Sequence, residues 1–418
     1  MTIARGHKSA DKAMGARGLG ERCGASEFVR HWNLDPDIAF LNHGSFGACP
    51  THVLEYQSRL RDQLERGPVQ FMHRDLEDLA DAARAETARF VGADADELAF
   101  VPNATTGVNT VLRSLTFEPG DELLTTSHEY NACRNAMDFV AARSGARVVA
   151  VDIPFPVESR DQVVELLMKG VTDRTRLALV DHITSLTGMV MPIERIVGSL
   201  AERGIDTLVD GAHGPGMIPL DLSAISPAYY TGNCHKWLCT PKGAAILYVR
   251  RDLQPGIRPL TISHGANSTR EDKTRFHLEF GWTGTDDPTA YLCVPESIRF
   301  MGSLLPGGWP ELWERNRKLA LDARALLCDV SGVEEPCPRE MIGTLASVPL
   351  SKGTFHFKTT ALAFDEVEQT IREDYGFEVP VLAYPEGPSS IIRVACQIYN
   401  SIEQYAALAE TLKYLLNR

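Results

Sequence analysis

The chain lacks paired cysteines and long apolar runs, and each absence excludes a class of protein. Its nine cysteines are scattered and form no C-x-x-C pair, so we expect neither a disulfide framework nor a metal site. No uninterrupted apolar stretch approaches the ~20 residues needed to cross a bilayer, and the N-terminus has no apolar signal core. These absences indicate a soluble, cytoplasmic protein with no membrane partner.

Basic residues are fewer than acidic residues. The chain has 42 of them against 55 acidic residues, which gives a formal net charge of −13. No basic stripe with interleaved aromatic residues interrupts this balance. Because a negative surface repels phosphate backbones and anionic lipids, neither nucleic acid nor a charged membrane is expected as a partner.

The length predicts more than one domain. At 418 residues, of which 44% are hydrophobic, the chain exceeds the ~250 residues at which single cores stop growing. We expect a disordered leader at 1–26, rich in Gly, Arg and Lys. A segment at 27–75 would contribute to a small domain and to the active-site entrance. A large domain would follow at 76–304, and the rest of the small domain at 305–418.

Strand-like and helical patterns alternate from about residue 75. Such alternation predicts an α/β fold, in which helices cover both faces of a mostly parallel sheet. After about residue 304 the pattern changes to a long charged helix, short strands and a last helix, typical of a separate α/β domain. The expected strands are 98–101, 122–126, 146–151, 177–180, 208–209 and 244–249, and the expected helices include one from about Thr106, 136–140, 313–327 and 403–416.

Asp210 and Lys236 are the residues whose chemistry is most specific. Asp210 ends an apolar run, 205–209, that is typical of a buried strand, and sites in open α/β sheets form at such ends. A lysine that loses its proton can attack an aldehyde, and a carboxylate can keep a pyridine nitrogen protonated. The pair therefore suits pyridoxal phosphate. Considered alone, Asp210 could also cap a turn, and Lys236 could be an ordinary surface lysine.

The turn at 102–107 lies between the first strand and its helix. Its small residues, hydroxyl groups and helix N-terminus suit a phosphate. An ordinary helix cap by Thr105 or Thr106 is an equal alternative from the local sequence.

Five motifs in order give the chain a family resemblance. It resembles the fold-type I pyridoxal-phosphate enzymes of the class V aminotransferase group, and within that group isopenicillin N epimerase and its relatives. The resemblance implies a large pyridoxal-phosphate domain followed by a smaller α/β domain. The motifs are Phe40–Gly47, Ala104–Gly107, Asp210–His213, Asn233–Trp237 with Pro241–Gly243, and Arg393–Asn400.

The resemblance assigns roles around the cofactor ring. Lys236 matches the Schiff-base lysine, with Lys242 as a competitor more typical of a solvated turn. Asp210 matches the partner of the pyridine nitrogen, and His213 the neighbour of the phenolic oxygen. Tyr130 matches the ring that stacks on the cofactor face opposite the lysine.

Further matches concern the phosphate, the phenolic oxygen and the partner subunit. Thr184 corresponds to a polar group near the phenolic oxygen, although the register could favour Ser185. Thr285 matches a threonine that reaches the phosphate of the neighbouring subunit, which implies a homodimer. The phosphate itself would be held by Thr105, Thr106, Asn233 and His235.

The resemblance also implies a substrate with a free α-carboxylate, either an amino acid or a short peptide. Arg393 matches the arginine that binds this carboxylate, because a planar guanidinium can hold it through two parallel hydrogen bonds. Its position inside an apolar run disfavours a surface salt bridge. The turn Asn42, His43, Gly44 and Ser45 would contact the rest of the substrate, and His43, His73 and Tyr130 are candidates for an acid on the face opposite Lys236.

The reaction type is left open among three. Epimerisation at the α-carbon follows the resemblance best; cleavage of a carbon–sulfur bond and transamination are the alternatives. A persulfide-forming desulfurase is disfavoured because 379–387 contains no cysteine. A regulator that only binds the cofactor would need a lost lysine or an added DNA-binding segment, and the sequence has neither.

Overall fold

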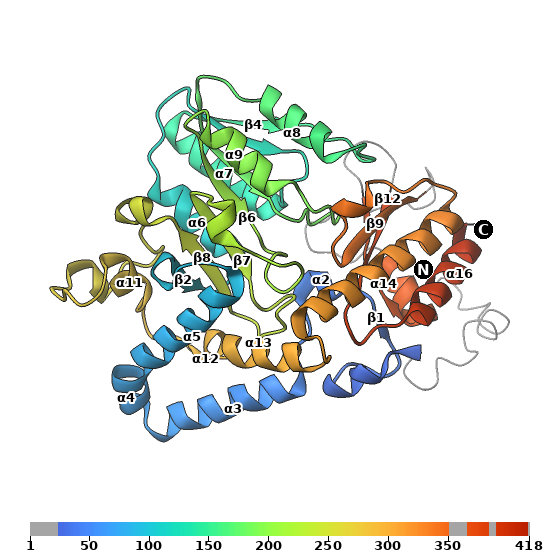
Figure 1. Cartoon of the computed structure of the whole chain (residues 1–418), viewed down its shortest axis with the longest axis horizontal. Coiled ribbons are helices and arrows are strands. Elements are labelled where there is room, and N and C mark those ends of the chain that lie inside the picture. Colours follow the sequence, from blue (N-terminus) through green and yellow to red (C-terminus); the bar gives the residue numbers. More distant parts are fainter. Residues whose placement is uncertain (1–23, 351–365, 384–389, 417–418) are drawn as a thin grey trace, which may run out of the picture.

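The structure is a computed structural model that describes residues 24–350, 366–383 and 390–416 (Figure 1). Most of the expected leader, 1–23, lies outside the described residues. Its end does not: Ser26 donates a hydrogen bond from its backbone N–H to the carbonyl of Tyr399, and one from its hydroxyl to the carbonyl of Ile398. No helix in the described ranges is long and apolar enough to cross a membrane.

A seven-stranded sheet forms the centre of the molecule and confirms the predicted α/β class. Strands β4, β3, β5, β6 and β7 are parallel in that spatial order, and β8 then pairs antiparallel with both β7 and β2. Parallel strands covered on both faces are apolar throughout, and all residues of β3, β7 and β8 are buried. The strands are β2 (Leu98–Val101), β3 (Glu122–Thr126), β4 (Arg147–Val151), β5 (Thr175–Asp181), β6 (Asp206–Asp210), β7 (Tyr229–Asn233) and β8 (Ala245–Val249).

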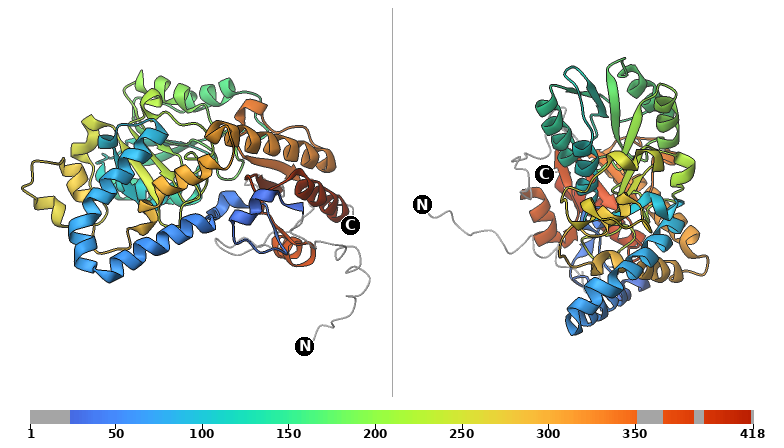
Figure 2. Two further views of the ribbon diagram at one scale, coloured as in Figure 1. Left: turned by 60° about the horizontal axis from the view of Figure 1, so that its bottom comes forward. Right: turned by 90° about the vertical axis from the view of Figure 1, so that its left-hand side faces the viewer.

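Helices cover the two faces of this sheet (Figure 2). On one face, α6 (Ala104–Ser114) and α7 (Asn131–Ser144) pack against alternate strand residues such as Leu177 and Leu179. On the other face, α8 (Arg160–Lys169) and α9 (Ile193–Ala201) pack against the residues that alternate with these along the same strand, Ala178 and Val180. Because successive side chains of a strand point to opposite faces of the sheet, each strand contributes residues to two separate hydrophobic cores.

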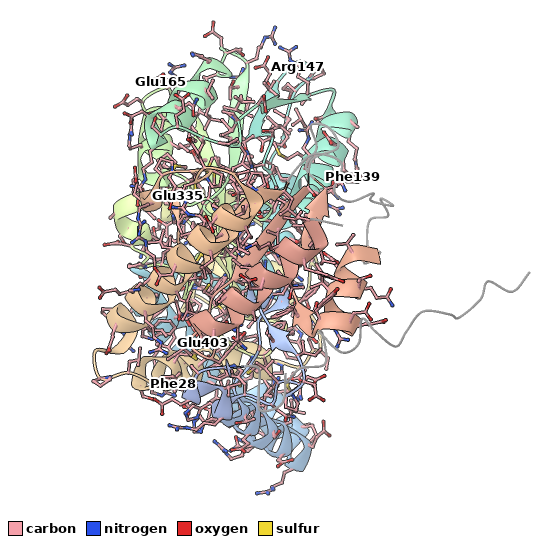
Figure 3. The ribbon with its side chains drawn as sticks, turned by 90° about the vertical axis from the view of Figure 1, so that its right-hand side faces the viewer. Phe28, Phe139, Arg147, Glu165, Glu335 and Glu403 are labelled. Atoms are coloured by element: carbon pink, nitrogen blue, oxygen red, sulfur yellow. The ribbon has the colours of Figure 1, made fainter. Side chains whose placement is uncertain are left out.

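A smaller sheet lies in the C-terminal region. Strands β11 (Val381–Ala383), β12 (Ser390–Ala395) and β9 (Leu345–Leu350) form an antiparallel sheet in that order. Helices α14 (Gly308–Ser331) and α16 (Ile402–Leu416) pack side by side against it (Figure 3). The N-terminal segment joins this region, because β1 (Ala39–Phe40) pairs parallel with β10 (Phe377–Glu378), which follows α15 (Glu366–Tyr375).

The N-terminal helices form a third layer, in which α3 and α5 pack against α12 and α13. The remaining helices are α2 (His43–Phe46), α3 (Thr51–Arg66), α4 (Pro68–Gln70), α5 (Leu76–Val91), α10 (Leu222–Ile225), α11 (Arg275–Phe280), α12 (Thr289–Leu292) and α13 (Val294–Ser303), with short turns of other helix types at Glu27–His31, Phe71–Asp75, Ala95–Glu97, Arg251–Gly256, His264–Asn267 and Arg339–Met341.

Three elements differ from their sequence expectation. Helix α6 begins at Ala104 rather than near Thr106, because Asn103 caps it: its Oδ1 accepts the backbone N–H of Thr106 at 2.8 Å. Helix α14 is longer at both ends than predicted and stops at Gly332, which adopts the left-handed conformation at φ 64°. Strand β7 was not predicted as a strand, because its threonine and asparagine are typical of loops.

Candidate active site

Three polar side chains lie at the carboxyl ends of neighbouring parallel strands. Asp181 ends β5, Asp210 ends β6, and Asn233 ends β7. Asp181 and Asp210 are direct cross-strand neighbours. Lys236 follows β7 in the next turn. The fold therefore brings together the two residues that the sequence singled out, at the edge of the sheet where sites are expected.

Lys236 is enclosed, and its Nζ lies 3.2 Å from Nε2 of His213. Burial and then the charge of Arg393 lower the pKa of Lys236 to about 8. A substantial fraction of the amine is therefore neutral and nucleophilic near neutral pH. Lys242 has a different position: its side chain is exposed, and its Nζ donates to the carbonyl of Gly47 at 2.8 Å.

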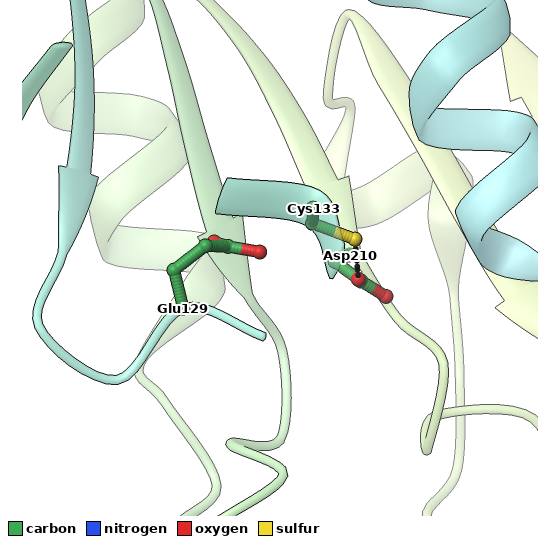
Figure 4. Close-up of side chains that lie close together, drawn as sticks. All are labelled: Glu129, Cys133 and Asp210. Atoms are coloured by element: carbon green, nitrogen blue, oxygen red, sulfur yellow. Dashed lines mark hydrogen bonds between the residues drawn. The ribbon is translucent and has the colours of Figure 1, made fainter. Parts of the chain in front are cut away.

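Asp210 is almost completely buried and accepts two hydrogen bonds. Its Oδ1 accepts the backbone N–H of Ala212 at 2.9 Å, and its Oδ2 accepts the thiol of Cys133 at 3.1 Å (Figure 4). The cysteine comes from the first turn of α7. The sequence analysis missed this residue, since scattered cysteines are usually ordinary core residues.

Glu129 is a second carboxyl group beside Asp210, also missed from the sequence. Its Oε2 accepts the hydroxyl of Thr125 at 3.1 Å, and its buried Oε1 has no partner within the described part of the chain. Acceptor and donor atoms of Glu129, Cys133 and Asp210 all lie within 4.8 Å of one another. Its position directly before Tyr130, a residue already assigned to the cofactor, was the signal that could have revealed it.

Three carboxyl groups in one buried cluster cannot all be charged. Burial raises the pKa of Glu129 and of Asp181 well above the ordinary range, and their mutual repulsion and that of Asp210 add to this rise. Burial also raises the pKa of Asp210, but its hydrogen bonds from Cys133 and Ala212 and the charge of Lys236 act in the opposite direction. Asp210 is therefore the carboxylate that keeps the negative charge.

Tyr130 caps the N-terminal end of α7 beside this cluster. The residue is 45% exposed, unlike the buried groups beside it. Burial of the hydroxyl, with Cys133 and Asp210 nearby, raises the pKa of the phenol. Such an exposed aromatic ring next to Asp210 is compatible with the predicted stacking on a cofactor.

The turn at the start of α6 is tied to the strand that precedes Lys236. Asn233 Oδ1 accepts the backbone N–H of Ala104 at 2.9 Å, so its side chain holds the turn in place. Thr106 donates its hydroxyl to Asn103, and Thr105 is half-buried. His235 is fixed through Nδ1, 3.0 Å from the carbonyl of Ala244, and burial lowers its pKa to about 4. These residues surround the helix N-terminus predicted to bind phosphate.

Arg393, on β12, is buried and held by three oxygen atoms. Its guanidinium donates to the hydroxyl of Ser45 at 2.9 Å, to the carbonyl of Ser185, and to Oδ1 of Asn42 at 3.5 Å. Burial lowers its pKa to about 10, so the group is still charged at neutral pH. Its Nε has no partner among the described residues. A charged, fixed guanidinium with a free N–H is the donor that a carboxylate needs.

The residues of the turn at 42–45 have two different roles. Asn42 and Ser45 hold Arg393, whereas His43 is fully buried and turned away into the protein. Nδ1 of His43 lies 2.7 Å from the hydroxyl of Tyr399, and Nε2 lies 3.0 Å from the carbonyl of Lys236. Burial lowers the pKa of His43 to about 3. This places His43 as a support for the lysine loop and gives it no access to a substrate.

Gly44 and Thr184 likewise have packing roles. A Cβ on Gly44 would lie 2.7 Å from the side chain of Leu345, so the turn contacts β9 too closely for a larger residue. The hydroxyl of Thr184 is used within its own loop, 2.7 Å from the hydroxyl of Thr187. Ser185 is the more exposed of the two alternatives for the phenolic-oxygen neighbour.

Two other predicted residues lie outside this cluster. Thr285 is exposed, in the segment Trp282–Pro288. Residues of this segment line a surface hollow that reaches Thr106 but includes neither Lys236 nor Asp210. His73 is exposed and lines a second hollow with Arg270 and Lys273, so the structure does not bring it to Lys236.

The arrangement fits pyridoxal phosphate. A buried carboxylate, a lysine whose pKa is lowered, a partly exposed tyrosine and a helix N-terminus are gathered at one edge of the sheet. Each corresponds to one part of the cofactor: the pyridine nitrogen, the aldehyde, the ring and the phosphate. The unpartnered Nε of Arg393 adds a place for a substrate carboxylate.

Comparisons with known proteins match most of the chain. The model of the aminotransferase class-V family matches residues 51–408. The isopenicillin N epimerase of Amycolatopsis lactamdurans is 34% identical over 397 residues, covering 92% of this chain and 96% of the relative. A probable chloroplastic L-cysteine desulfhydrase of Arabidopsis thaliana is 30% identical over 414 residues, covering 94% and 85%.

Solved structures share the fold at lower identity. Two structures of the cystine C-S lyase C-DES match with a TM-score of 0.76 and 22% identity, covering 90% of this chain and 97% and 96% of theirs. One contains the product cysteine persulfide. The other contains glycine covalently linked to the PLP cofactor of that lyase.

Proposed function

This chain belongs to the class-V aminotransferase family, and from that premise we propose that it moves a proton at the α-carbon of an amino acid, as an epimerase does. Its cofactor is pyridoxal 5′-phosphate, which when bound supplies an aldehyde for an amine and a ring that accepts electrons from the α-carbon. The substrate is an amino acid or short peptide with a free α-carboxylate. The finer assignment rests on the side chains that follow.

One observation carries this proposal: the charge of Arg393 reaches two proton-bearing groups that come from different elements. Lys236 comes from the turn after β7, and Tyr130 from the start of α7. The charge of Arg393 acts on the pKa of both groups, so both lie near the proposed carboxylate site. Epimerisation needs one group to remove the α-proton and another to return a proton from the opposite side.

The protonation states of the two groups suit these tasks. With a pKa of about 8, Lys236 has a neutral fraction that can accept a proton at Nζ. Tyr130 has a raised pKa, so its phenol keeps a proton that it can donate. Arg393 fixes the carboxylate and thereby orients the Cα–H bond between them. Asp210, which keeps its negative charge in the carboxyl cluster, stabilises positive charge on the cofactor ring.

Cleavage of a carbon–sulfur bond is the alternative function. The desulfhydrase relative favours it, and β-elimination requires only one base, which Lys236 can supply. Transamination is a third possibility, and it would deliver the proton to the cofactor. The three reactions share the binding of the carboxylate by Arg393 and differ in where the proton goes.

A panel of amino acids incubated with the holoenzyme in deuterated water tests the proposal. Epimerisation predicts solvent deuterium at Cα with loss of chirality. Pyruvate with sulfide would instead support the lyase, and conversion of the cofactor to its pyridoxamine form would support transamination. Either of these as the main outcome overturns the epimerase assignment.

A Tyr130→Phe variant makes the test specific for the two-sided arrangement. The phenylalanine ring keeps the aromatic face but has no proton to donate. We expect inversion to fall by at least ~10²-fold while exchange of the α-proton with retention continues, because Lys236 still works on its own side. Inversion at the wild-type rate would exclude Tyr130 as the second acid.

We also propose that the active unit is a homodimer. Thr285 is exposed in the single chain, and its neighbours Thr283, Gly284 and Asp286 line a hollow that reaches the phosphate turn at Thr106. A second copy that covers this hollow would bring its own Thr285 to the site.

A further inference from the structure

The residue after the reactive lysine, Trp237, is buried against the same histidine that touches Lys236. Its indole Nε1 lies 3.1 Å from Nδ1 of His213, and Nε2 of His213 lies 3.2 Å from Nζ of Lys236. Trp237 and His213 are each only 1% exposed. The three side chains therefore form a continuous chain of hydrogen bonds, two of whose members are buried.

The direction of these bonds follows from the chemistry of the three groups. An indole N–H can only donate, so Nδ1 of His213 must accept and cannot carry a proton. Burial, with Lys236, Arg393 and His43 nearby, lowers the pKa of His213 well below its ordinary value, so the ring is neutral. A neutral imidazole with an unprotonated Nδ1 carries its proton on Nε2.

We propose that Trp237 is a positioning residue that fixes the tautomer of His213, so that His213 presents an N–H donor to Lys236. Only a neutral amine can accept this hydrogen bond, because an ammonium group has no lone pair. The chain Trp237–His213–Lys236 thus stabilises the reactive form of the lysine. Burial and Arg393 lower the pKa of Lys236 in the same direction, whereas Asp210, Asp181 and Cys133 oppose them. The inference rests on the proposed role of Lys236 and is independent of the reaction type.

The opposite tautomer shows what the tryptophan prevents. If the proton were on Nδ1, it would face the indole N–H, and two donors would meet in a buried space without a partner. Nε2 would then accept a hydrogen bond from a Lys236 ammonium and stabilise the unreactive form.

Nitrogen NMR of the full-length holoenzyme, labelled with ¹⁵N-histidine, tests the tautomer directly. His213 signals are assigned by their loss in His213→Gln. We expect a protonated Nε2 and an unprotonated, hydrogen-bonded Nδ1 in the unaltered protein. A proton on Nδ1, or a doubly protonated ring, overturns the proposal without any Trp237 variant being made.

Trp237→Phe tests the consequence for Lys236. The loss of the indole donor should allow both tautomers and weaken the bias towards the neutral amine. The rate at which Lys236 of the cofactor-stripped, full-length protein captures pyridoxal phosphate should then reach half its maximum about 0.5 to 1 pH unit higher than in the wild type. An unchanged midpoint together with an unchanged NMR pattern would overturn the proposal.

Two controls separate the hydrogen bond from packing. Trp309 donates a similar bond at 3.0 Å to the carbonyl of Ile298, outside the site, so Trp309→Phe should leave the midpoint unchanged. A glutamine at position 213 carries its own N–H donor, so Trp237→Phe should shift the midpoint less in a His213→Gln background. Equal shifts in the two backgrounds would mean that Trp237 acts on Lys236 by packing alone.

Discussion

Lys236 and Lys242 lie six positions apart in very different surroundings. Burial and the charge of Arg393 lower the pKa of Lys236 to about 8, whereas the side chain of Lys242 is exposed. A lysine in water stays protonated up to about pH 10.4. The lowered pKa therefore gives Lys236 an appreciable neutral fraction near pH 7 to 8.

Replacing each lysine by alanine should give opposite results. Lys236→Ala should abolish the visible absorbance of the bound cofactor. Lys242→Ala should keep this absorbance and lose only the hydrogen bond to Gly47, at a cost of about 1 kcal/mol in the free energy of unfolding. Absorption spectra and denaturant titration measure the two effects. If borohydride attached the cofactor to Lys242 in the Lys236→Ala protein, the assignment would be wrong.

The thiol of Cys133 should matter through its hydrogen bond to Asp210. Cys133→Ser keeps a donor, whereas Cys133→Val fills the volume without one. We expect the valine variant to raise the pKa of Asp210 and to weaken cofactor binding about 3- to 10-fold, the net equivalent of one ordinary hydrogen bond. The serine variant should bind within about 2-fold of the wild type. Equilibrium dialysis with pyridoxal phosphate measures both, and equal affinity in all three proteins would contradict this role.

Single residues also show how far the sequence could predict the site. Lys236, Asp210 and Arg393 were recognisable because each has one chemical task and a motif around it. Glu129 and Cys133 were missed because their importance comes from α7 meeting the end of β6, a contact between residues 77 or more positions apart that no local pattern encodes. His43 was assigned to the substrate, but the short helix α2 turns its ring towards Tyr399.

At the scale of elements, the approach of α6 to β7 positions the phosphate turn. Gly107 lies where a Cβ would contact the side chain of Thr231, 2.7 Å from its Cβ. The glycine in the Ala104–Gly107 motif is thus required by helix-to-strand packing. Asn233 at the end of the same strand then holds the N–H of Ala104.

Gly107→Ala should push α6 away from β7. We expect it to lower the free energy of unfolding by about 1 to 3 kcal/mol and to weaken cofactor binding through the displaced turn. A compensating Thr231→Ala should recover part of both losses, with a coupling of at least about 0.5 kcal/mol. Gly198, in the middle of α9 with no atom within 4 Å of its Cβ position, is the control. Gly198→Ala should stabilise the protein slightly. A coupling energy near zero between Gly107→Ala and Thr231→Ala would exclude the proposed contact.

The strands of the main sheet were predicted more accurately than the rest of the fold. Strands at the centre of a covered sheet are rich in apolar residues, so β2, β3, β4, β5, β6 and β8 stand out in the sequence. Strand β7 did not, since it is covered on both sides yet carries the polar groups Thr231 and Asn233 for packing and for the site. Its pairing with β6 and β8 is determined by tertiary contacts, which override the propensities of the individual residues.

At the scale of the whole molecule, the exposed hollow beside Thr106 is the feature that a single chain leaves unexplained. Its walls include Phe100, Trp282 and Tyr291, and large apolar groups seldom remain open to water in a monomer. Exposed Leu260 and Ile262 lie on the adjoining segment, and Leu260 also lines the hollow. A second copy of this chain with two-fold symmetry would cover both surfaces at once.

Mixing two inactive variants tests whether the sites are shared between subunits. In a shared dimer, each site takes Lys236 from one chain and Thr285 from the other. A mixed dimer of Lys236→Ala and Thr285→Ala chains then has one intact site and one that lacks both groups, so unfolding and refolding the two proteins together should restore cofactor binding to about a quarter of the wild-type capacity. Thr283→Ala, a neighbour in the same segment, replaces Thr285→Ala in the control mixture and should itself bind cofactor normally. If the mixture of Lys236→Ala and Thr285→Ala binds no more cofactor than the average of its parents while light scattering shows dimers, Thr285 serves its own subunit and the shared site is excluded.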